Sequence, residues 1–176
     1  EDDTVEGEYL TRVAREENGT LVWEDQLLPV VEPELPQVQI MMDMNALTHL
    51  KSLPPSRLAL EVDFFPMPTP VQDKGGRPYF PYMLLMVEGS QGMIIGFAMM
   101  PPAETKEILW GQIPLEVVSK LAELGARPHE IRVVSELLAH LLEPVGRELS
   151  CPIKLMEQLP GLEDARDGLL QFSGGW

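Results

Sequence analysis

The sequence predicts a mixed α/β fold in which three antiparallel strands precede alternating helices and strands. Between Leu58 and Pro102, three apolar runs of strand length are separated by Pro- and Gly-containing connections. From residue 103 onward, runs with helical spacing of apolar residues alternate with short apolar runs. A strand-like region precedes both, so we expect a β-hairpin/meander extension over residues 1–56 and an α/β domain over residues 57–176, with the boundary at Pro54-Pro55.

Residues 8–15 and 20–30 alternate between polar and apolar, and Asn18-Gly19 stands between them. Asn-Gly favours the tight turn of a two-residue hairpin loop, so this region predicts a β-hairpin. Residues 37–44 form another apolar run of strand length, whereas residues 45–53 fit either a short helix or a strand.

An internal similarity suggests a duplicated three-strand unit. Residues 23–30 resemble residues 60–67, residues 36–43 resemble 81–88, and each copy ends in a pair of prolines. If the duplication is real, residues 45–53 take the place of the strand at 93–100 and are themselves a strand.

The first strand of the main sheet, LALEVDFF, places side chains of opposite character on its two faces. Alternation directs Leu60 and Val62 to one face and Glu61 and Asp63 to the other. Residues 66–78 then form a long connection rich in Pro and Gly. The Gly75-Gly76 pair in this connection is not followed by a helix, so a phosphate-binding loop is not indicated.

The C-terminal part predicts three helices separated by strands. Pro114 suits the first turn of a helix that ends at Gly125, and residues 131–134 form a short buried strand. Ser135 suits the cap of a helix reaching Leu149 with Pro144 inside it, followed by a strand at 152–156 and a helix at 162–170.

Composition narrows the function. The net charge of −15 argues against a nucleic-acid partner, because such binding depends on Lys and Arg that neutralise phosphates. Cys151 is the only cysteine and lies in an apolar context, so we interpret it as a buried side chain. No apolar run approaches a membrane span and the first residues are acidic, so we expect a cytoplasmic protein without membrane contact.

The order of three strands, helix, strand, helix, strand and helix resembles the ribonuclease H-like fold. The phrases GARPHEIRVV, LLEPVGREL and LPGLEDA also resemble a bacterial family described as a domain of unknown function. The first resemblance implies two divalent cations, Mg or Mn, held by acidic residues. The matching positions are Asp63 on the first strand, Glu136 after the fourth strand, Glu104 or Glu107 on a helix, and Glu163 or Asp164 near the last helix. Active enzymes carry Asp at the fourth-strand position, and Glu136 falls one residue late.

Two hypotheses follow. The one we favour is a non-catalytic ribonuclease H-like module, without a cofactor, that binds a protein partner or acts as a scaffold. On this view Glu61 and Asp63 lie on the solvated face of an antiparallel sheet. The alternative is a metal-dependent nuclease or phosphotransfer enzyme with Asp63, Glu136 and Asp164 as ligands and Glu61 or Glu107 completing the set. The strand edges also predict a homodimer.

Overall fold

The computed structural model describes residues 7–29, 37–72 and 74–173 of the chain. Contacts divide the chain into two units, Glu1–Leu35 and Pro36–Trp176. The division therefore falls about 20 residues before the boundary that the sequence suggested at Pro54-Pro55, and residues 37–56 belong to the second unit.

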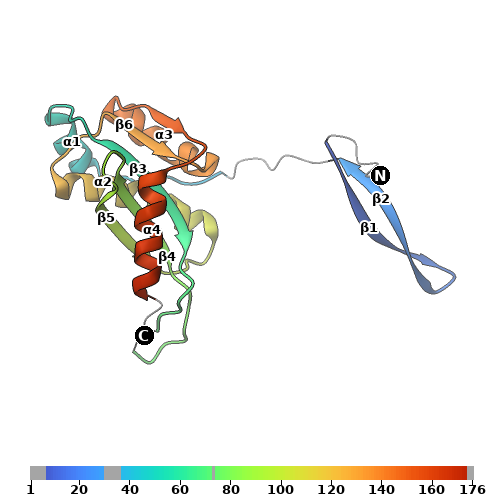
Figure 1. The fold of residues 1–176 in the computed structure, drawn as a ribbon. Helices are drawn as coiled ribbons and strands as arrows, with labels where there is room; N and C mark the ends of the chain where they lie inside the picture. The colour runs from blue at the N-terminus through green and yellow to red at the C-terminus, as the bar shows by residue number, and fades with distance from the viewer. Residues whose placement is uncertain (1–6, 30–36, 73, 174–176) are drawn as a thin grey trace. The chain divides into compact units, whose positions relative to one another are not determined.

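The first unit is the β-hairpin that the sequence predicted. Strands β1 (Glu8–Glu17) and β2 (Thr20–Pro29) pair antiparallel along their whole length (Figure 1). Asn18 and Gly19 both have positive φ, 53° and 78°, as a tight two-residue turn between twisted strands requires.

The second unit contains a five-stranded mixed sheet. The strands are β3 (Ala59–Pro66), β4 (Tyr82–Glu88), β5 (Met93–Met100), β6 (Glu130–Val133) and β7 (Ile153–Leu155), in the order β5-β4-β3-β6-β7. β4 runs antiparallel to β3 and β5, whereas β6 is parallel to β3 and β7 is parallel to β6. The predicted succession of three antiparallel strands followed by alternating helices and strands is therefore confirmed.

Four helices accompany this sheet: α1 (Met44–Ser52), α2 (Lys106–Leu124), α3 (Glu136–Leu149) and α4 (Pro160–Ser173). α2 begins eight residues before the start that the sequence suggested, and Pro114 lies inside it. α3 likewise continues through Pro144. A proline removes one backbone hydrogen bond, but both helices bury an apolar face that outweighs this loss. None of these described helices is long and apolar enough to cross a membrane.

The region before β3 corrects the duplication hypothesis. Residues 45–52 lie in helix α1, which Asp43 caps by accepting hydrogen bonds from the backbone of Asn45 and Ala46. Residues 37–43 contain no strand. The apolar spacing that resembled a strand instead buries Leu47 and Leu50 on one side of a helix, so the three-strand unit is not repeated.

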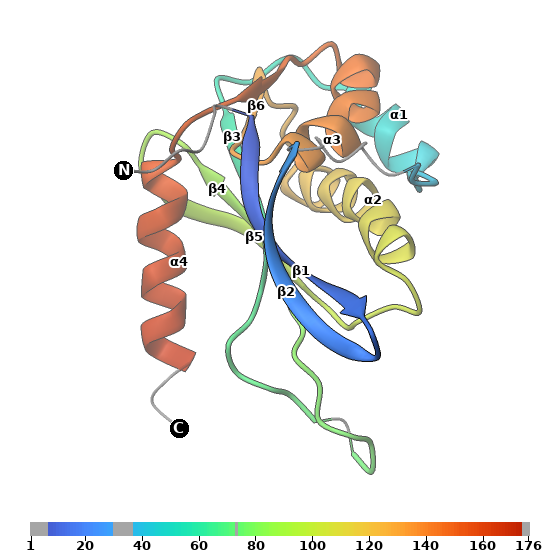
Figure 2. The ribbon, with the colours of Figure 1, turned by 90° about the vertical axis from the view of Figure 1, so that its right-hand side faces the viewer.

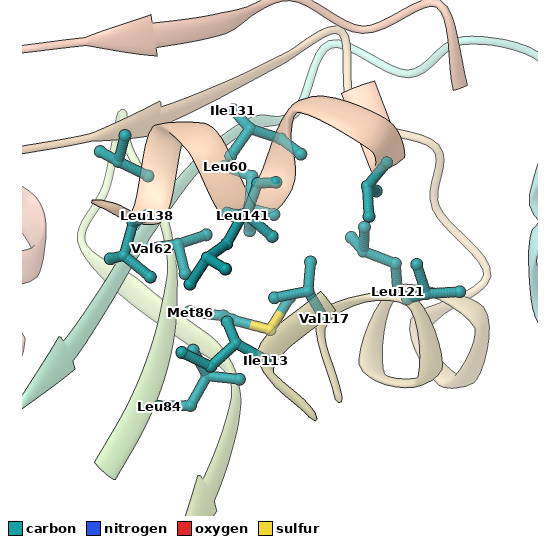
Figure 3. Packing of buried hydrophobic residues seen from close by; sticks show 14 of the residues in the cluster. Leu60, Val62, Leu84, Met86, Ile113, Val117, Leu121, Ile131, Leu138 and Leu141 are labelled. Atoms are coloured by element: carbon teal, nitrogen blue, oxygen red, sulfur yellow. The ribbon is translucent and has the colours of Figure 1, made fainter. Parts of the chain in front are cut away.

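The helices form two layers around the sheet. α1, α2 and α3 lie on one face and α4 lies on the other (Figures 1 and 2). The main core fills the first of these interfaces with side chains of the central strands and of α2 and α3 (Figure 3): Leu60, Val62, Leu84, Met86, Ile113, Val117, Leu121, Ile131, Leu138 and Leu141. A smaller core joins the opposite face of β4 to α4 through Met83, Leu85, Val87, Leu159 and Leu162.

The segment before α1 packs directly against α2 at a glycine. The backbone N–H of Met41 donates to the carbonyl of Gly111 at 2.9 Å. A Cβ atom on Gly111 would collide with the backbone oxygen of Gln39, which cannot move without displacing the whole segment. Gly111 therefore allows residues 37–43 to lie against α2.

We expect Gly111→Ala to lower the free energy of unfolding by about 1–3 kcal/mol, because the added methyl group has no space. Gly168→Ala is the matched control, since Gly168 is also helical and a Cβ there meets nothing within 4 Å. We expect this control to stabilise by up to about 1 kcal/mol through helix propensity. Urea denaturation measures both variants, and equal stability of the two would contradict the packing described here.

Candidate functional site

Glu61 and Asp63 project from the central strand β3 toward the layer that contains α4. Their neighbours Leu60 and Val62 are fully buried in the main core on the other face, as alternation along the strand predicts. The interpretation of this face as solvated is wrong for Glu61, which is only 2% exposed. The helix α4, whose first turn reaches Glu61, accounts for the difference.

Glu61 occupies a narrow space at the start of α4. Its Oε2 atom accepts a hydrogen bond from the backbone N–H of Leu162 at 3.1 Å, one of the amides that a helix leaves free in its first turn. A Cβ on Gly89 would lie 2.7 Å from Oε1, and a Cβ on Gly161 would lie 3.3 Å from Oε2. The two glycines therefore make room for this carboxylate between β3 and α4.

Burial raises the pKa of Glu61 above its ordinary value, because removal of water disfavours the charged form. The hydrogen bond from Leu162 and the charge of Arg132, whose Nη1 lies 3.7 Å from Oε1, oppose that rise. A second carboxylate, Glu88, adds a smaller repulsion that raises the pKa further.

A row of charges continues from Glu61 across β6 and β7. Glu61, Arg132 and Lys154 occupy paired positions on three adjacent strands. Glu130 is 5% exposed; its Oε1 accepts from Arg132 Nε at 2.6 Å, and its Oε2 forms an ion pair with Lys154. Lys154, which has the larger effect, and Arg132 lower the pKa of Glu130 despite its burial. The ion pairs therefore form a chain of alternating charge, from Glu61 to Arg132, Glu130 and Lys154.

Asp63 has partners of its own. One carboxylate oxygen accepts from the backbone N–H of Phe64 at 2.8 Å, and the other lies 3.5 Å from Nη1 of Arg166 on α4. The Arg166 guanidinium also lies over the ring of Phe65, 5.7 Å from its centroid. Sequence reasoning missed Arg166 and Arg132, because no local pattern relates them to residues on β3 about 100 and 70 positions away.

The other predicted metal ligands are exposed at helix starts. Glu136 is the first residue of α3 after its cap Ser135, and Asp164 lies in the exposed part of α4. Glu107 lies in the first turn of α2, where a hydrogen bond from backbone N–H and one from the Thr105 hydroxyl lower its pKa. Glu104 and Glu163 are likewise exposed. Among the described side chains, no three or more Asp, Glu, His or Cys residues gather closely enough to hold a metal ion.

An open hollow of about 380 Å³ lies elsewhere, where the end of α3 meets β7. It is lined by Glu143, Gly146, Arg147, Ser150, Cys151, Pro152 and Ile153. Cys151 is buried as the sequence predicted, and burial raises the pKa of its thiol to about 11. The thiol is therefore protonated at neutral pH and is a poor nucleophile.

We expect Glu61→Gln to change how stability depends on pH. Because the pKa of Glu61 is raised above 4.5 in the folded state, the folded protein binds this proton more tightly than the unfolded chain. Wild-type stability therefore falls as pH rises from that value through the raised pKa, and the variant lacks this contribution.

The free energy of unfolding of Glu61→Gln minus that of the wild type should be larger at about pH 7.5 than at about pH 5 in urea titrations. Glu157→Gln, at an exposed position after β7, is the control for the same substitution outside the core. A pH-independent difference for Glu61→Gln would contradict the burial cost assigned to this carboxylate.

Residues 46–170 match DUF6930, a domain of unknown function, and this match covers more than half of the 176-residue chain. The matched region begins within α1 and therefore leaves out the hairpin β1–β2. No curated protein matches the chain.

Proposed function

The chain belongs to the DUF6930 family, and we propose that it is a non-catalytic ribonuclease H-like module that acts in protein interaction or as a scaffold. The strand order β5-β4-β3-β6-β7 supports the ribonuclease H-like relationship. In this order β3, the first of three antiparallel strands, is central. β6 then pairs parallel with β3 and β7 pairs parallel with β6, and each of the two follows a helix.

The observation that carries the non-catalytic part of the proposal is the engagement of both β3 carboxylates within the protein. Glu61 accepts from the backbone of Leu162 and lies near Arg132, whereas Asp63 pairs with Arg166. A divalent cation at these carboxylates would have to compete with two guanidinium groups and would meet their positive charge. The arrangement suits carboxylates that anchor α4 and β6 to the central strand.

The hairpin supports a role in protein interaction. The β1–β2 register places four apolar side chains on one face, each 44–63% exposed: Leu10, Leu21, Trp23 and Leu27. An isolated two-stranded hairpin is only marginally stable in water, so contact with a partner would stabilise it.

Charge indicates the chemistry of that partner. Between residues 7 and 29 the chain carries five acidic and two basic residues, within a protein of net charge −15. We therefore propose a protein partner whose apolar surface is bordered by Lys and Arg side chains.

A manganese titration tests the non-catalytic proposal. After treatment with a chelator, the wild type and Asp63→Asn should both show no saturable heat of Mn²⁺ binding at millimolar metal in calorimetry. Asp63→Asn should cost at most about 1 kcal/mol of stability, since Arg166 is 37% exposed. Saturable binding to the wild type that is lost in Asp63→Asn would instead favour the metal-dependent nuclease or phosphotransfer enzyme.

The hairpin face is tested by comparing its two sides in the full chain. Trp23→Lys changes the face that carries the four apolar side chains, where Trp23 is 61% exposed, and Val22→Lys places the same charge on the opposite face, where Val22 is 44% exposed. The recovery of proteins that cross-link to the wild type should fall about tenfold with Trp23→Lys, as for a central interface residue, and should be unchanged with Val22→Lys. Equal recovery by both variants would remove this face from the interaction.

A further inference from the structure

Strand β5 forms one edge of the five-stranded sheet, and no described strand pairs with its outer side. Its eight residues, MIIGFAMM, include neither a charged residue nor a proline. Natural edge strands usually carry such residues, because an unpaired row of backbone groups otherwise pairs with another strand. The opposite edge, β7, has only three residues and includes Lys154.

The side chains of β5 extend an apolar layer beyond the cover of α4. Ile94, Phe97 and Met99 lie opposite Val87, Leu85 and Met83 of β4 and therefore share their face of the sheet. The three β4 side chains are buried beneath α4, whereas those of β5 are 38%, 56% and 51% exposed. The layer therefore ends in water at the same edge where the backbone is unpaired.

We propose that β5 pairs antiparallel with β5 of a second copy of this chain, about a twofold axis close to Phe97. Such pairing joins two sheets edge to edge and brings the two Phe97 rings together on one face.

A second copy is the occupant that charge favours. The chain carries 28 acidic and 13 basic residues, so most approaches between two copies meet repulsion of like charges. β5 is a strand free of charge, so two copies of it can meet without burying a carboxylate. A basic partner of the kind proposed for the hairpin would find no counter-charge on this strand.

The length of the contact is limited by an irregularity in β5. Gly96 pairs with Met86 and Ile94 pairs with Val87, so Ile95 is an extra residue that bulges from the strand. Pairing that is symmetric about Phe97 is therefore regular only over residues 96–98, because Met99 of one copy would lie opposite the bulged Ile95 of the other. A short ladder of this kind predicts a reversible dimer whose population depends on protein concentration.

Analytical ultracentrifugation of the full chain across the micromolar range tests the proposal. The wild type should shift with concentration from 19.7 kDa toward twice that mass. Phe97→Lys should weaken the dimer by at least about tenfold, because two lysines would face each other beside the axis. Leu155→Lys, at a 52% exposed position on the other edge strand, is the matched control and should dimerise as the wild type does.

Several results would overturn the proposal: a wild type that stays monomeric throughout, a Phe97→Lys dimer as tight as the wild type, or equal weakening by Leu155→Lys. Loss of the dimer in Trp23→Lys would assign self-association to the hairpin and would also overturn it. If Phe97→Lys fails to fold by circular dichroism, Met99→Lys, at a 51% exposed position, replaces it.

Amide hydrogen exchange provides a readout without any substitution. Outward-facing backbone N–H groups of residues 96–98 should be protected at high protein concentration and lose that protection on dilution, and unchanged exchange would count against the pairing. The dimer proposal and the proposed scaffold role can fail separately. The manganese titration and the cross-linking of the hairpin variants test the scaffold role, whereas the Phe97→Lys variant tests the dimer.

Discussion

The alternation of side chains along β3 determines what each face of the sheet can carry. One face presents Leu60 and Val62, which are fully buried with α2 and α3. The other presents Glu61 and Asp63, and carboxylates beneath a helix need partners. Leu162 and Arg132 serve Glu61, and Arg166 serves Asp63. The first turn of α4 and Arg132 on β6 therefore meet the two acidic residues of the central strand, beside the smaller apolar core that also holds α4.

Local chemistry made most elements of the fold predictable. The Asn18-Gly19 turn, the alternation along β3 and the Ser135 cap of α3 each act within a few residues, and each appears in the structure. Prediction was weaker where tertiary packing overrides local preference. α2 passes through Pro114 because its apolar side is buried, and α1 is a helix because Leu47 and Leu50 enter the core.

The candidate site shows where sequence reasoning ends. Alternation alone placed Glu61 and Asp63 on the same face, but their partners are decided by tertiary contacts. Leu162 is 101 residues from Glu61, and Arg166 is 103 residues from Asp63. An acidic chain offers many carboxylates near any expected ligand position, so spacing could not tell a metal ligand from a side chain paired with Arg. The cations that lie beside these carboxylates, Arg132 and Arg166, carry no motif.

The separation in sequence between Glu61 and the start of α4 also has a consequence for folding during synthesis. During synthesis β3 leaves the ribosome about a hundred residues before Leu162 does, so the β3–β4–β5 meander must wait with one face uncovered. Two carboxylates, those of Glu61 and Asp63, lie along one edge of that uncovered face, on β3. The charges that later anchor α4 thus keep the nascent meander from presenting a wholly apolar surface to other chains in the cell.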